Sequence, residues 1–517
     1  MSSALPAPLS RRAVLGLGGA AGAALLTSCR AAASAGDDDA PPRRGGTVRA
    51  VFPGAGAKET MDPHAQRQFV DIARHKQVFD RLLDLDARLR PVPRLARGWE
   101  SRENGTVWRF RLRRAVFHDG HRLDADDVLY TLARILDPGA ADRVARGSLS
   151  VVDLKKSRGI GSDTVELVLK RPHAELPTLL ATSGTSVVRH GYRDPSRPVG
   201  TGPFRFASFH AGRSFTARRF DDHWDGAPYP DEIRILSAET EARASAVQAG
   251  EVDYAHEMSP TFARVVEANP RVRIVSTPRS GAEGIAMKTD RPPFDDPRAA
   301  LALKLLADRE RLVEVVLGAR GTLGNDMYGK GYTYYPEHVP QRERDVDEAR
   351  RLLRATGTLN KRISFYTSTA ADGFTDAAHL FAEQAAEAGL RIDVSTGPPE
   401  SYYTDQLTTG LLGSHRCGAM PIPSYIGDRL TATGPKNASA WKRPEFDAEF
   451  HRAQAVVDTA ERTRLYGELQ RTVHDKGGLL LWGHPDWLNA VSGRLHGVAS
   501  APPNTVDWAR FDTVWLA

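Results

Sequence analysis

Hydrophobic and polar residues alternate strictly along "VWRFRLRRAVF", residues 107–117. The apolar side chains of Trp108, Phe110 and Leu112 fall on one face and the arginines between them fall on the other, which predicts a half-buried strand. Asp119-Gly120 follows, a dipeptide that tolerates positive φ and forms tight turns. The pattern therefore predicts a strand that ends in a turn.

A helix is expected directly after that turn. Asp124 precedes an apolar run with helical spacing, and Asp127 stands at the third helical position, which is the arrangement of a capping box. The run consists of Val128, Leu132, Ile135 and Leu136. The stretch "VFHDGHRLDADDV" is rich in potential metal ligands, but His118 and His121 lie on either side of the turn and no second cluster completes a site. We interpret the stretch as architecture.

Further helix starts recur along the chain. In "PPFDDPRAALALKLLADRERL" either Asp295 or Asp296 can cap a helix with Pro297 in its first turn. The apolar face of that helix continues through Leu301, Leu305 and Leu312, and Asp308 is expected to pair locally with Arg309.

The same pattern appears at "RDVDEARRLLRATG", with Asp345 as cap, Glu348 at the third position and Gly357 as stop. "GTGPF", 200–204, turns sharply into a strand, and its glycines are expected to serve a steric role. Strands that alternate with such helices indicate an α/β protein.

Composition limits the class of protein. The chain has 517 residues, which corresponds to roughly three folded units, with 41% hydrophobic and 26% charged residues. Its net charge of +6 is spread thinly over the sequence. Because nucleic-acid binding requires clustered Lys and Arg, we exclude nucleic acid as a partner.

The first residues form a targeting segment. Arg11 and Arg12 in "SRRAVL" resemble a twin-arginine export signal, and "LTSC" ending at Cys29 resembles a lipobox whose cysteine is lipidated. The apolar run between them is shorter than the about 20 residues that span a bilayer. We expect a signal peptide at 1–28 and a lipidated tether at 29–46, with a plain signal peptide as the alternative. Only Cys417 then remains, so no disulfide is expected.

Residues 94–138 resemble the signature of the peptide/nickel family of extracytoplasmic solute-binding proteins of ABC importers, the dipeptide and oligopeptide binders. Further blocks match in the order of the family: "GGTVRA", "MDPH", "PVGTGPFRF", "DDHWDGAPYPDEIRI", "AGEVDYA", "RPPFDDPRAALALKLLADRERLVEVV" and "RPEFDAEF". The resemblance covers nearly the whole chain after the targeting segment.

The resemblance implies an α/β, two-lobe periplasmic-binding-protein fold with an extra inserted subdomain and a ligand cleft between the lobes. It places lobe I at 47–69, 196–279 and 480–517, the inserted subdomain at 70–195 and lobe II at 280–479. The chain would cross from one lobe to the other near 279 and 480, and these two connections would form a hinge about which the lobes close on the ligand.

Ligand contacts in the family come from stretches that correspond to 416–428 and 479–487. Peptide-binding members carry there a Trp and an Asp that pairs with the peptide ammonium group. An alignment without gaps places Ala419 at the position of that Asp and Arg416 at the position of a flanking aromatic residue. A gap could instead align Asp428 with the Asp of the family. The candidate ligand-binding residues are Asp428, Tyr425, Cys417, Trp441, Trp482, His484 and Trp487. For each aromatic residue, a place in the core is the alternative.

The function that the resemblance implies is capture of a small solute, most of all a di- or oligopeptide, and its delivery to an ABC permease and ATPase. The protein is expected to be a monomer on the extracytoplasmic face of the membrane, anchored by lipid, with neither a metal nor a cofactor. Two alternative functions remain: a ligand sensor of the same fold, and a binder of a non-peptide solute such as a metal chelate, sugar, opine or antibiotic. An exported enzyme is disfavoured because G-x-S-x-G, HExxH and P-loop patterns are absent.

Overall fold

The computed structural model describes residues 41–54, 56–66, 68–403 and 407–517. Arg11, Arg12 and Cys29, on which the export and lipidation predictions rest, lie outside the described residues. Pro42–Ala517 form one compact unit. Among the residues that the structure describes, no helix is long and apolar enough to cross a membrane.

Seven strands form the first sheet, in the spatial order β12-β19-β11-β1-β10-β9-β8. They are β1 (Thr47–Phe52), β8 (Phe204–His210), β9 (Ser214–Arg219), β10 (Glu232–Ser237), β11 (Tyr254–Ala255), β12 (Val272–Thr277) and β19 (Trp487–Ser492). The strand β1 pairs in parallel with both β10 and β11, whereas the other pairs are antiparallel. We call this sheet with its helices the seven-stranded body.

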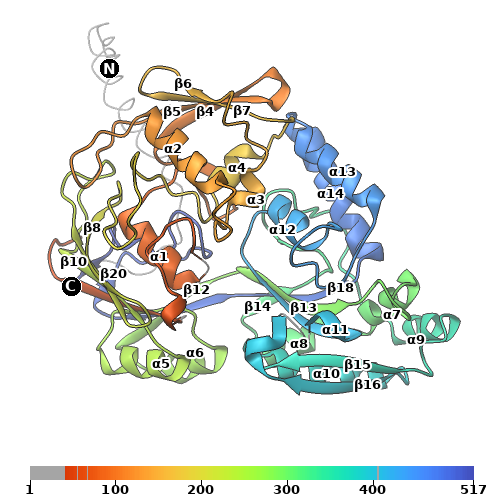
Figure 1. The fold of residues 1–517 in the computed structure, drawn as a ribbon. Helices are drawn as coiled ribbons and strands as arrows, with labels where there is room; N and C mark the ends of the chain where they lie inside the picture. The colour runs from red at the N-terminus through yellow and green to blue at the C-terminus, as the bar shows by residue number, and fades with distance from the viewer. Residues whose placement is uncertain (1–40, 55, 67, 404–406) are drawn as a thin grey trace, which may run out of the picture. The chain divides into compact units, whose positions relative to one another are not determined.

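Helices cover both faces of this sheet (Figure 1). Phe52 of β1 packs into a core with α1 (Phe69–Val78), whereas the adjacent Val51 points to the other face and packs with α5 (Thr240–Ala249) and α6 (Pro260–Val266). The two cores follow from the twofold side-chain alternation of a strand.

The glycines of "GTGPF" have the steric role that the sequence predicts. A Cβ atom on Gly200 would lie 2.0 Å from the carbonyl oxygen of Val78, and one on Gly202 would lie 2.6 Å from the carbonyl carbon of the same residue. The end of α1 therefore packs directly on the backbone that leads into β8.

Six strands form the second sheet, in the order β14-β18-β13-β17-β15-β16. They are β13 (Gly281–Met287), β14 (Gly321–Leu323), β15 (Arg362–Ser368), β16 (Arg391–Gly397), β17 (Leu412–Gly418) and β18 (Leu479–Pro485). The helices α7 (Pro297–Leu306), α8 (Arg309–Val316), α9 (Val346–Ala355) and α10 (Phe374–Ala386) share its core. We call this sheet with its helices the six-stranded body.

The chain crosses between the two bodies at two adjacent places. The first crossing joins β12, which ends at Thr277, to β13, which begins at Gly281, and the second joins β18 to β19 at Asp486. The amide of Ser280 donates a hydrogen bond to the carbonyl of Pro485 at 2.9 Å. The sequence divides the chain near 480, but β18 remains in the six-stranded sheet up to Pro485.

A four-stranded sheet follows the order β4-β5-β7-β6. Its strands are β4 (Ala96–Arg102), β5 (Val107–Leu112), β6 (Arg158–Gly159) and β7 (Thr164–Val168). The predicted strand is confirmed, because Trp108, Phe110 and Leu112 of β5 are buried while Arg111 is exposed.

The predicted capping box is confirmed as well. The side chain of Asp124 accepts from the amides of Asp126 and Asp127 and begins α2 (Ala125–Leu136), and Asp127 accepts from the amide of Asp124 in return. His118, in the turn before this helix, contacts the carbonyl of Gly202 through Nε2 at 2.9 Å.

The region after Pro297 differs from the prediction of one continuous helix. α7 ends at Leu306 and Asp308 caps a second helix, α8, by accepting from the amide of Arg311 at 2.9 Å. Arg309 does not pair with Asp308 but with the buried Asp326, at 2.9 Å. A buried carboxylate requires a charged partner, and the new helix start brings Arg309 to it. Asp345 caps α9 as predicted.

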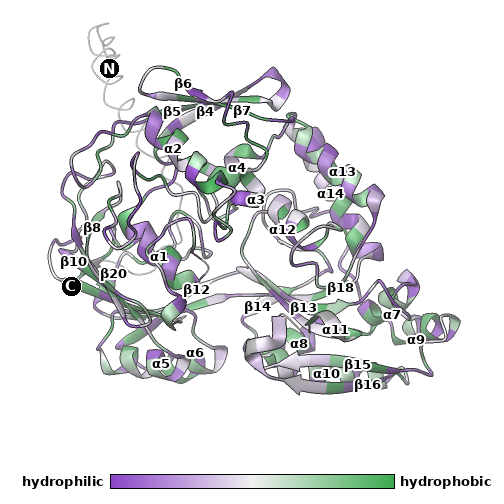
Figure 2. Cartoon of the chain, in the orientation of Figure 1, coloured by the Kyte–Doolittle hydropathy of each residue, from purple (hydrophilic) through white to green (hydrophobic). Residues whose placement is uncertain are grey.

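The remaining helices lie mainly toward the end of the chain. They are α3 (Arg146–Leu149), α4 (Leu176–Leu180), α11 (Leu407–Thr409), α12 (Ile422–Arg429), α13 (Pro444–Ala455) and α14 (Thr459–Lys476), with 3-10 turns at Gly56–Lys58, Glu103–Gly105 and Pro399–Ser401. Short strands are β2 (Leu83–Leu85), β3 (Pro91–Pro93), β20 (Leu495–His496) and β21 (Trp515–Leu516). Figure 2 shows hydrophilic residues along much of α13 and α14, while Phe450 and Leu465 on these helices are buried.

Candidate functional site

Three charged side chains meet beside the two crossings. Arg416 of β17 lies directly opposite Glu283 in the antiparallel register with β13, and its Nε is 3.0 Å from Oε1 of Glu283. Its Nη2 is 3.3 Å from Oε1 of Glu257, which follows β11 in the seven-stranded body. We call Arg416, Glu257 and Glu283 the crossing cluster, and it joins side chains of both bodies.

Burial differs among the three members of the cluster. Glu283 is buried, whereas the side chains of Arg416 and Glu257 are 27% and 29% exposed. Burial raises the pKa of Glu283 to about 8, although Arg416 acts in the opposite direction. For Arg416 burial alone would lower the pKa, but Glu283 and Glu257 outweigh it and the pKa is raised. The guanidinium therefore stays charged, while Glu283 lacks full compensation for its own charge.

An aromatic wall of the seven-stranded body lies next to the cluster. The carbon of the Arg416 guanidinium is 5.8 Å from the ring centre of Trp487 in β19. Phe69, at the start of α1, packs edge-on against Trp487 at 5.1 Å and against Trp508 at 5.8 Å. A Cβ atom on Gly418 would lie 3.9 Å from the Phe69 ring, so the end of β17 reaches this wall.

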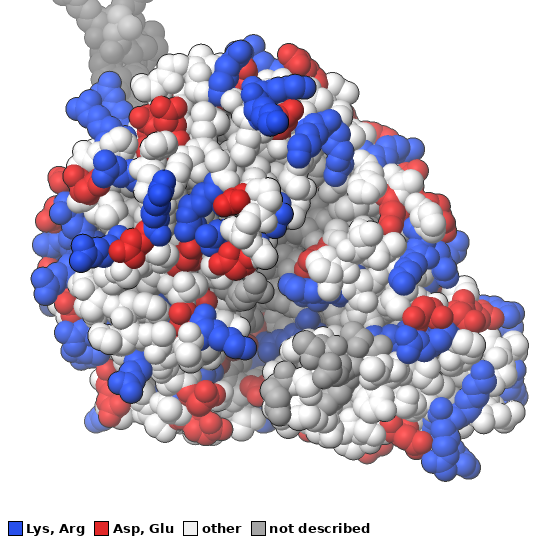
Figure 3. Space-filling view, viewed as in Figure 1, with Lys and Arg blue, Asp and Glu red and all other residues white. Residues whose placement is uncertain are grey.

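Two nitrogen atoms of the wall have no partner. Nε1 of Trp487 and Nε1 of Trp508 are buried and make no hydrogen bond to any residue that the structure describes. An indole N–H that is buried usually finds an acceptor. Figure 3 shows a hollow in this face of the molecule, with Lys, Arg, Asp and Glu side chains around it.

Tyr425 and Cys417, two of the residues predicted from the sequence, lie in the core on the other side of β17. Tyr425 stacks on Tyr328 with ring centres 3.9 Å apart, and the Tyr328 hydroxyl donates to the carbonyl of Gly418 at 2.7 Å. Cys417 is buried, and burial raises the pKa of its thiol. Both residues support the end of the strand that carries Arg416.

The other predicted residues contact groups outside the crossing cluster. Trp441 packs edge-on against Phe446, and Trp482 is in the core of the six-stranded body. His484 is buried, contacts the carbonyl of Gly281 at 2.9 Å, and has a pKa that burial lowers to about 4.

Asp428 belongs to α12, where its carboxylate lies 3.4 Å from Nζ of Lys436. Of the predicted set, Trp487 is the residue whose ring contacts the cluster.

Sequence reasoning did not select Glu257 and Glu283, and it noted Arg416 only as a departure from the family pattern. A signal for Glu283 is present in "GAEGIAM", where one charged residue interrupts a strand that is buried at every position. Glu257 has a φ of 56°, a conformation uncommon for residues other than glycine. Neither signal identifies the partner, which comes from the register of β13 with β17.

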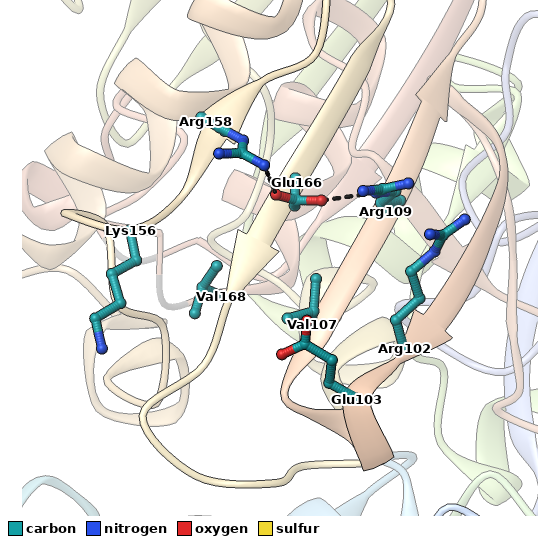
Figure 4. A pocket seen from close by; sticks show the side chains of 8 residues that line it. All are labelled: Arg102, Glu103, Val107, Arg109, Lys156, Arg158, Glu166 and Val168. Atoms are coloured by element: carbon teal, nitrogen blue, oxygen red, sulfur yellow. Dashed lines mark hydrogen bonds and ion pairs between the residues drawn. The ribbon is translucent and has the colours of Figure 1, made fainter.

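Two further hollows lie away from the crossings. An open one of about 640 Å³ covers the outer face of the four-stranded sheet (Figure 4). Glu166 at its centre accepts from Arg109 and pairs with Arg158, at 2.7 and 2.8 Å, so this carboxylate neutralises part of the basic lining. The second, of about 280 Å³, lies beside Trp99, Tyr334 and Pro421.

The potential metal ligands of the early turn are engaged in the helix start. Ligand atoms of His121, Asp124 and Asp127 lie within 4.8 Å of one another. Asp127 accepts from the amides of His190 and Asp124, at 2.7 and 3.1 Å, and Asp124 is the cap of α2. The trio thus has the architectural role that the sequence predicts.

Residues 90–436 match the family described as bacterial extracellular solute-binding proteins, family 5 (middle region). The chain is 26% identical to the peptide transport periplasmic protein SapA of Salmonella typhimurium (strain LT2), over 84% of this chain and 86% of that protein. It is 24% identical to heme-binding protein A of Haemophilus influenzae, over 83% and 86% of the two chains.

Among solved structures, the fold is similar to the ABC transporter-associated periplasmic binding protein DppA from Helicobacter pylori in complex with the peptide STSA. The TM-score is 0.77 at 19% identity, and the match covers 92% of this chain and 98% of that one. This likeness confirms the predicted α/β fold class of periplasmic binding proteins.

Proposed function

Because the chain belongs to the bacterial extracellular solute-binding proteins of family 5, we propose that it captures a di- or oligopeptide between two lobes and delivers it to a membrane permease. Membership of this family makes it a binding protein of an ABC transporter, extracytoplasmic and without enzymatic activity. The ligand, the closing motion and the lipid anchor are parts of the proposal.

The observation that supports a closing cleft is the meeting of both bodies at the paired crossings. We take the seven-stranded body with the four-stranded sheet as lobe I and its inserted subdomain, and the six-stranded body as lobe II. Two short adjacent connections allow rotation of one lobe against the other, as in hinged binding proteins. Arg416 and Glu283 of the six-stranded body would then face the ligand from one lobe, and Glu257 and the Trp487 wall from the other.

A peptide is favoured by the relatives. SapA is named for peptide transport and the DppA structure holds a peptide, whereas heme-binding protein A indicates that other solutes occur among relatives of similar identity. A metal chelate, sugar, opine or antibiotic is therefore the alternative ligand class.

The test is to purify the protein without denaturation and identify by mass spectrometry what leaves the cleft on unfolding. The ligand-free protein is then titrated with a library of di- and tripeptides and with panels of the alternative solutes. We expect a peptide to be retained and to raise thermal stability, by about 2.7 kcal/mol at a hundredfold excess over Kd. Retention of a non-peptide solute would contradict the peptide assignment, and binding of no solute at all would contradict the function.

A further inference from the structure

The smaller of the two hollows lies between the proposed inserted subdomain and the proposed lobe II. It has a volume of about 280 Å³. Trp99 and Trp108, on the inner face of the four-stranded sheet, form one wall. Tyr334 and Pro421 of lobe II contribute to the other. The hollow is therefore a concave site that both sides of the contact build together, and it uses neither the crossing cluster nor the Trp487 wall.

The size and the lining of this hollow favour an aromatic ring. Because a cavity of about 150 Å³ holds benzene, a volume of about 280 Å³ has room for one substituted or bicyclic ring. Most of the lining side chains are aromatic, proline or aliphatic, and four of them carry an aromatic ring: Trp99, Trp108, Tyr332 and Tyr334. Aromatic rings pack well against one another in offset or edge-on arrangements. A flat apolar ring is thus the group that this lining accommodates.

The charge at the rim favours a negative group on that ring. The lining contains one carboxylate, Glu175, and its cations are Arg88, Arg90 and Arg462. Arg462 pairs with this carboxylate at 3.0 Å, and Arg90 pairs with Asp86 at 2.7 Å. Arg88 is exposed, and its guanidinium makes no ion pair with any residue that the structure describes. One positive charge therefore remains for a carboxylate, which a guanidinium can bind through two parallel hydrogen bonds.

We infer that this hollow is a second binding site, for a small aromatic carboxylate whose ring lies against Trp99 and Tyr334 and whose carboxylate pairs with Arg88. Two sources offer this chemistry: a free aromatic acid, and the carboxyl end of a peptide that finishes in Phe, Tyr or Trp. The site goes beyond the proposed function, because it lies outside the crossing cluster and its existence does not depend on peptide capture there.

Occupation of the site favours the closed arrangement of the lobes, a consequence that rests on the proposed closing motion. The turn that carries Arg88 already touches lobe II, since the hydroxyl of Thr333 donates to the carbonyl of Arg88 at 3.3 Å. Tyr332 of the lining donates from its hydroxyl to the carbonyl of Arg279, in the first crossing, at 2.6 Å. A molecule that needs both walls binds the closed state better and shifts the population toward it. It then strengthens binding of a solute between the lobes by the same factor as the solute strengthens its own binding.

The experiment is isothermal titration calorimetry of the purified protein with indoleacetate, indole and acetate. These probes carry the ring with a carboxylate, the ring alone and the carboxylate alone. We expect indoleacetate to bind with one molecule per chain, indole to bind about tenfold more weakly because the charged hydrogen bonds are lost, and acetate not to bind.

A competition experiment distinguishes the two sources. Displacement of indoleacetate by Ala-Ala-Trp, and not by Ala-Ala-Ala, would assign the site to the end of a peptide. Binding of indoleacetate that Ala-Ala-Trp does not disturb would assign it to a free aromatic acid. Either result supports the inference.

Two variants test the residues of the site. Arg88→Gln should weaken binding of indoleacetate about tenfold and leave binding of indole unchanged. Trp99→Ala should weaken binding of both probes, because it removes a wall of the hollow. Arg111→Gln is the matched control, since it changes an exposed arginine on the outer face of the same sheet, and it should bind both probes as the parent does.

The inference is overturned if the parent binds no indoleacetate at concentrations on the order of 1 mM. It is overturned as well if Arg88→Gln and Trp99→Ala both bind indoleacetate as the parent does, because the acid would then lie elsewhere. Neither result affects the proposed function, which is tested with peptides and with the solute that co-purifies. Conversely, a protein that binds indoleacetate in this hollow but captures no solute between the lobes would contradict the proposed function alone.

Discussion

Glu283 occupies a position in which a carboxylate is costly, because it stands in a strand whose other residues are also buried. Burial raises its pKa to about 8, whereas a glutamate in an unfolded chain has a pKa of about 4.3. Between these two values the folded state binds more protons than the unfolded state. The free energy of unfolding therefore falls as the pH rises through this window.

We predict that Glu283→Gln flattens this dependence. In the ligand-free variant, calorimetric unfolding temperatures at pH 5 and pH 8 should differ less than in the parent, because the neutral amide has no proton to lose. Glu251→Gln, which changes an exposed glutamate, should keep the parent profile. Identical pH profiles for the parent and Glu283→Gln would show that the burial of Glu283 does not shift its titration.

For single residues, the sequence points to part of the candidate site. Trp487 is among the candidates because a family stretch passes through it, and Arg416 is visible as a departure from the family pattern. Glu283 is not found, because its partner lies far along the chain and only the register of β13 with β17 brings the two together. Asp428 could be proposed from position alone, but the direction of α12 turns its carboxylate toward Lys436.

Among the elements, α2 depends on one side chain at its start. Asp124 accepts from the amides of Asp126 and Asp127, which would otherwise lack partners in the first helical turn. Asp124→Ala should lower the free energy of unfolding by about 1 kcal/mol, within the usual range of 0.5–2 kcal/mol for a lost cap. The measurement is chemical denaturation of the ligand-free protein.

Asp126→Ala is the matched control, because Asp126 is exposed in the same turn and contributes only through the helix dipole. Its effect should be the smaller of the two. Equal losses would indicate that charge near the helix terminus matters and that the cap hydrogen bonds do not.

Local patterns predict the elements well where a cap and an apolar period agree, as at Asp124 and Asp345. They fail after Leu306, where the apolar period continues although the helix ends. There Asp308 can cap a new helix, and Arg309 gains a buried partner in Asp326, which is distant from it in the sequence and cannot be anticipated from local spacing.

For the whole molecule, the proposed export and anchoring can be tested directly. Cys29→Ala should release the protein from the membrane fraction, since several acyl chains contribute about 0.8 kcal/mol per buried CH₂ and no other anchor is proposed. Arg11→Lys together with Arg12→Lys should keep the protein inside the cell. Cell fractionation followed by a high-salt wash measures both, and membrane retention of the Cys29 variant would contradict the lipoprotein assignment.

A second contact between the proposed lobes lies far from the crossings along the chain. Glu175, beside α4 of the inserted subdomain, accepts from the hydroxyl of Tyr334 at 2.8 Å and pairs with Nε of Arg462 in α14 at 3.0 Å. The side chains of Glu175 and Arg462 are 5% and 11% exposed. The amide of Ala174 also donates to the carbonyl of Gln454 at 2.7 Å. These contacts join the proposed inserted subdomain to α13 and α14 of the proposed lobe II.

If the lobes close about the crossings, this ion pair forms only in the closed state, because opening would separate α14 from Glu175 and expose both groups to water. Glu175→Gln should therefore favour the open state, since Arg462 would be buried on closure without a counter-charge. We expect a larger radius of gyration of the ligand-free variant in X-ray scattering and at least tenfold weaker ligand binding, as the closed population falls.

Glu468→Gln, which alters an exposed pair on the same helix, should leave both quantities unchanged. Scattering curves that are the same for Glu175→Gln and the parent, with and without bound ligand, would show that this contact does not separate and that the lobes do not open there.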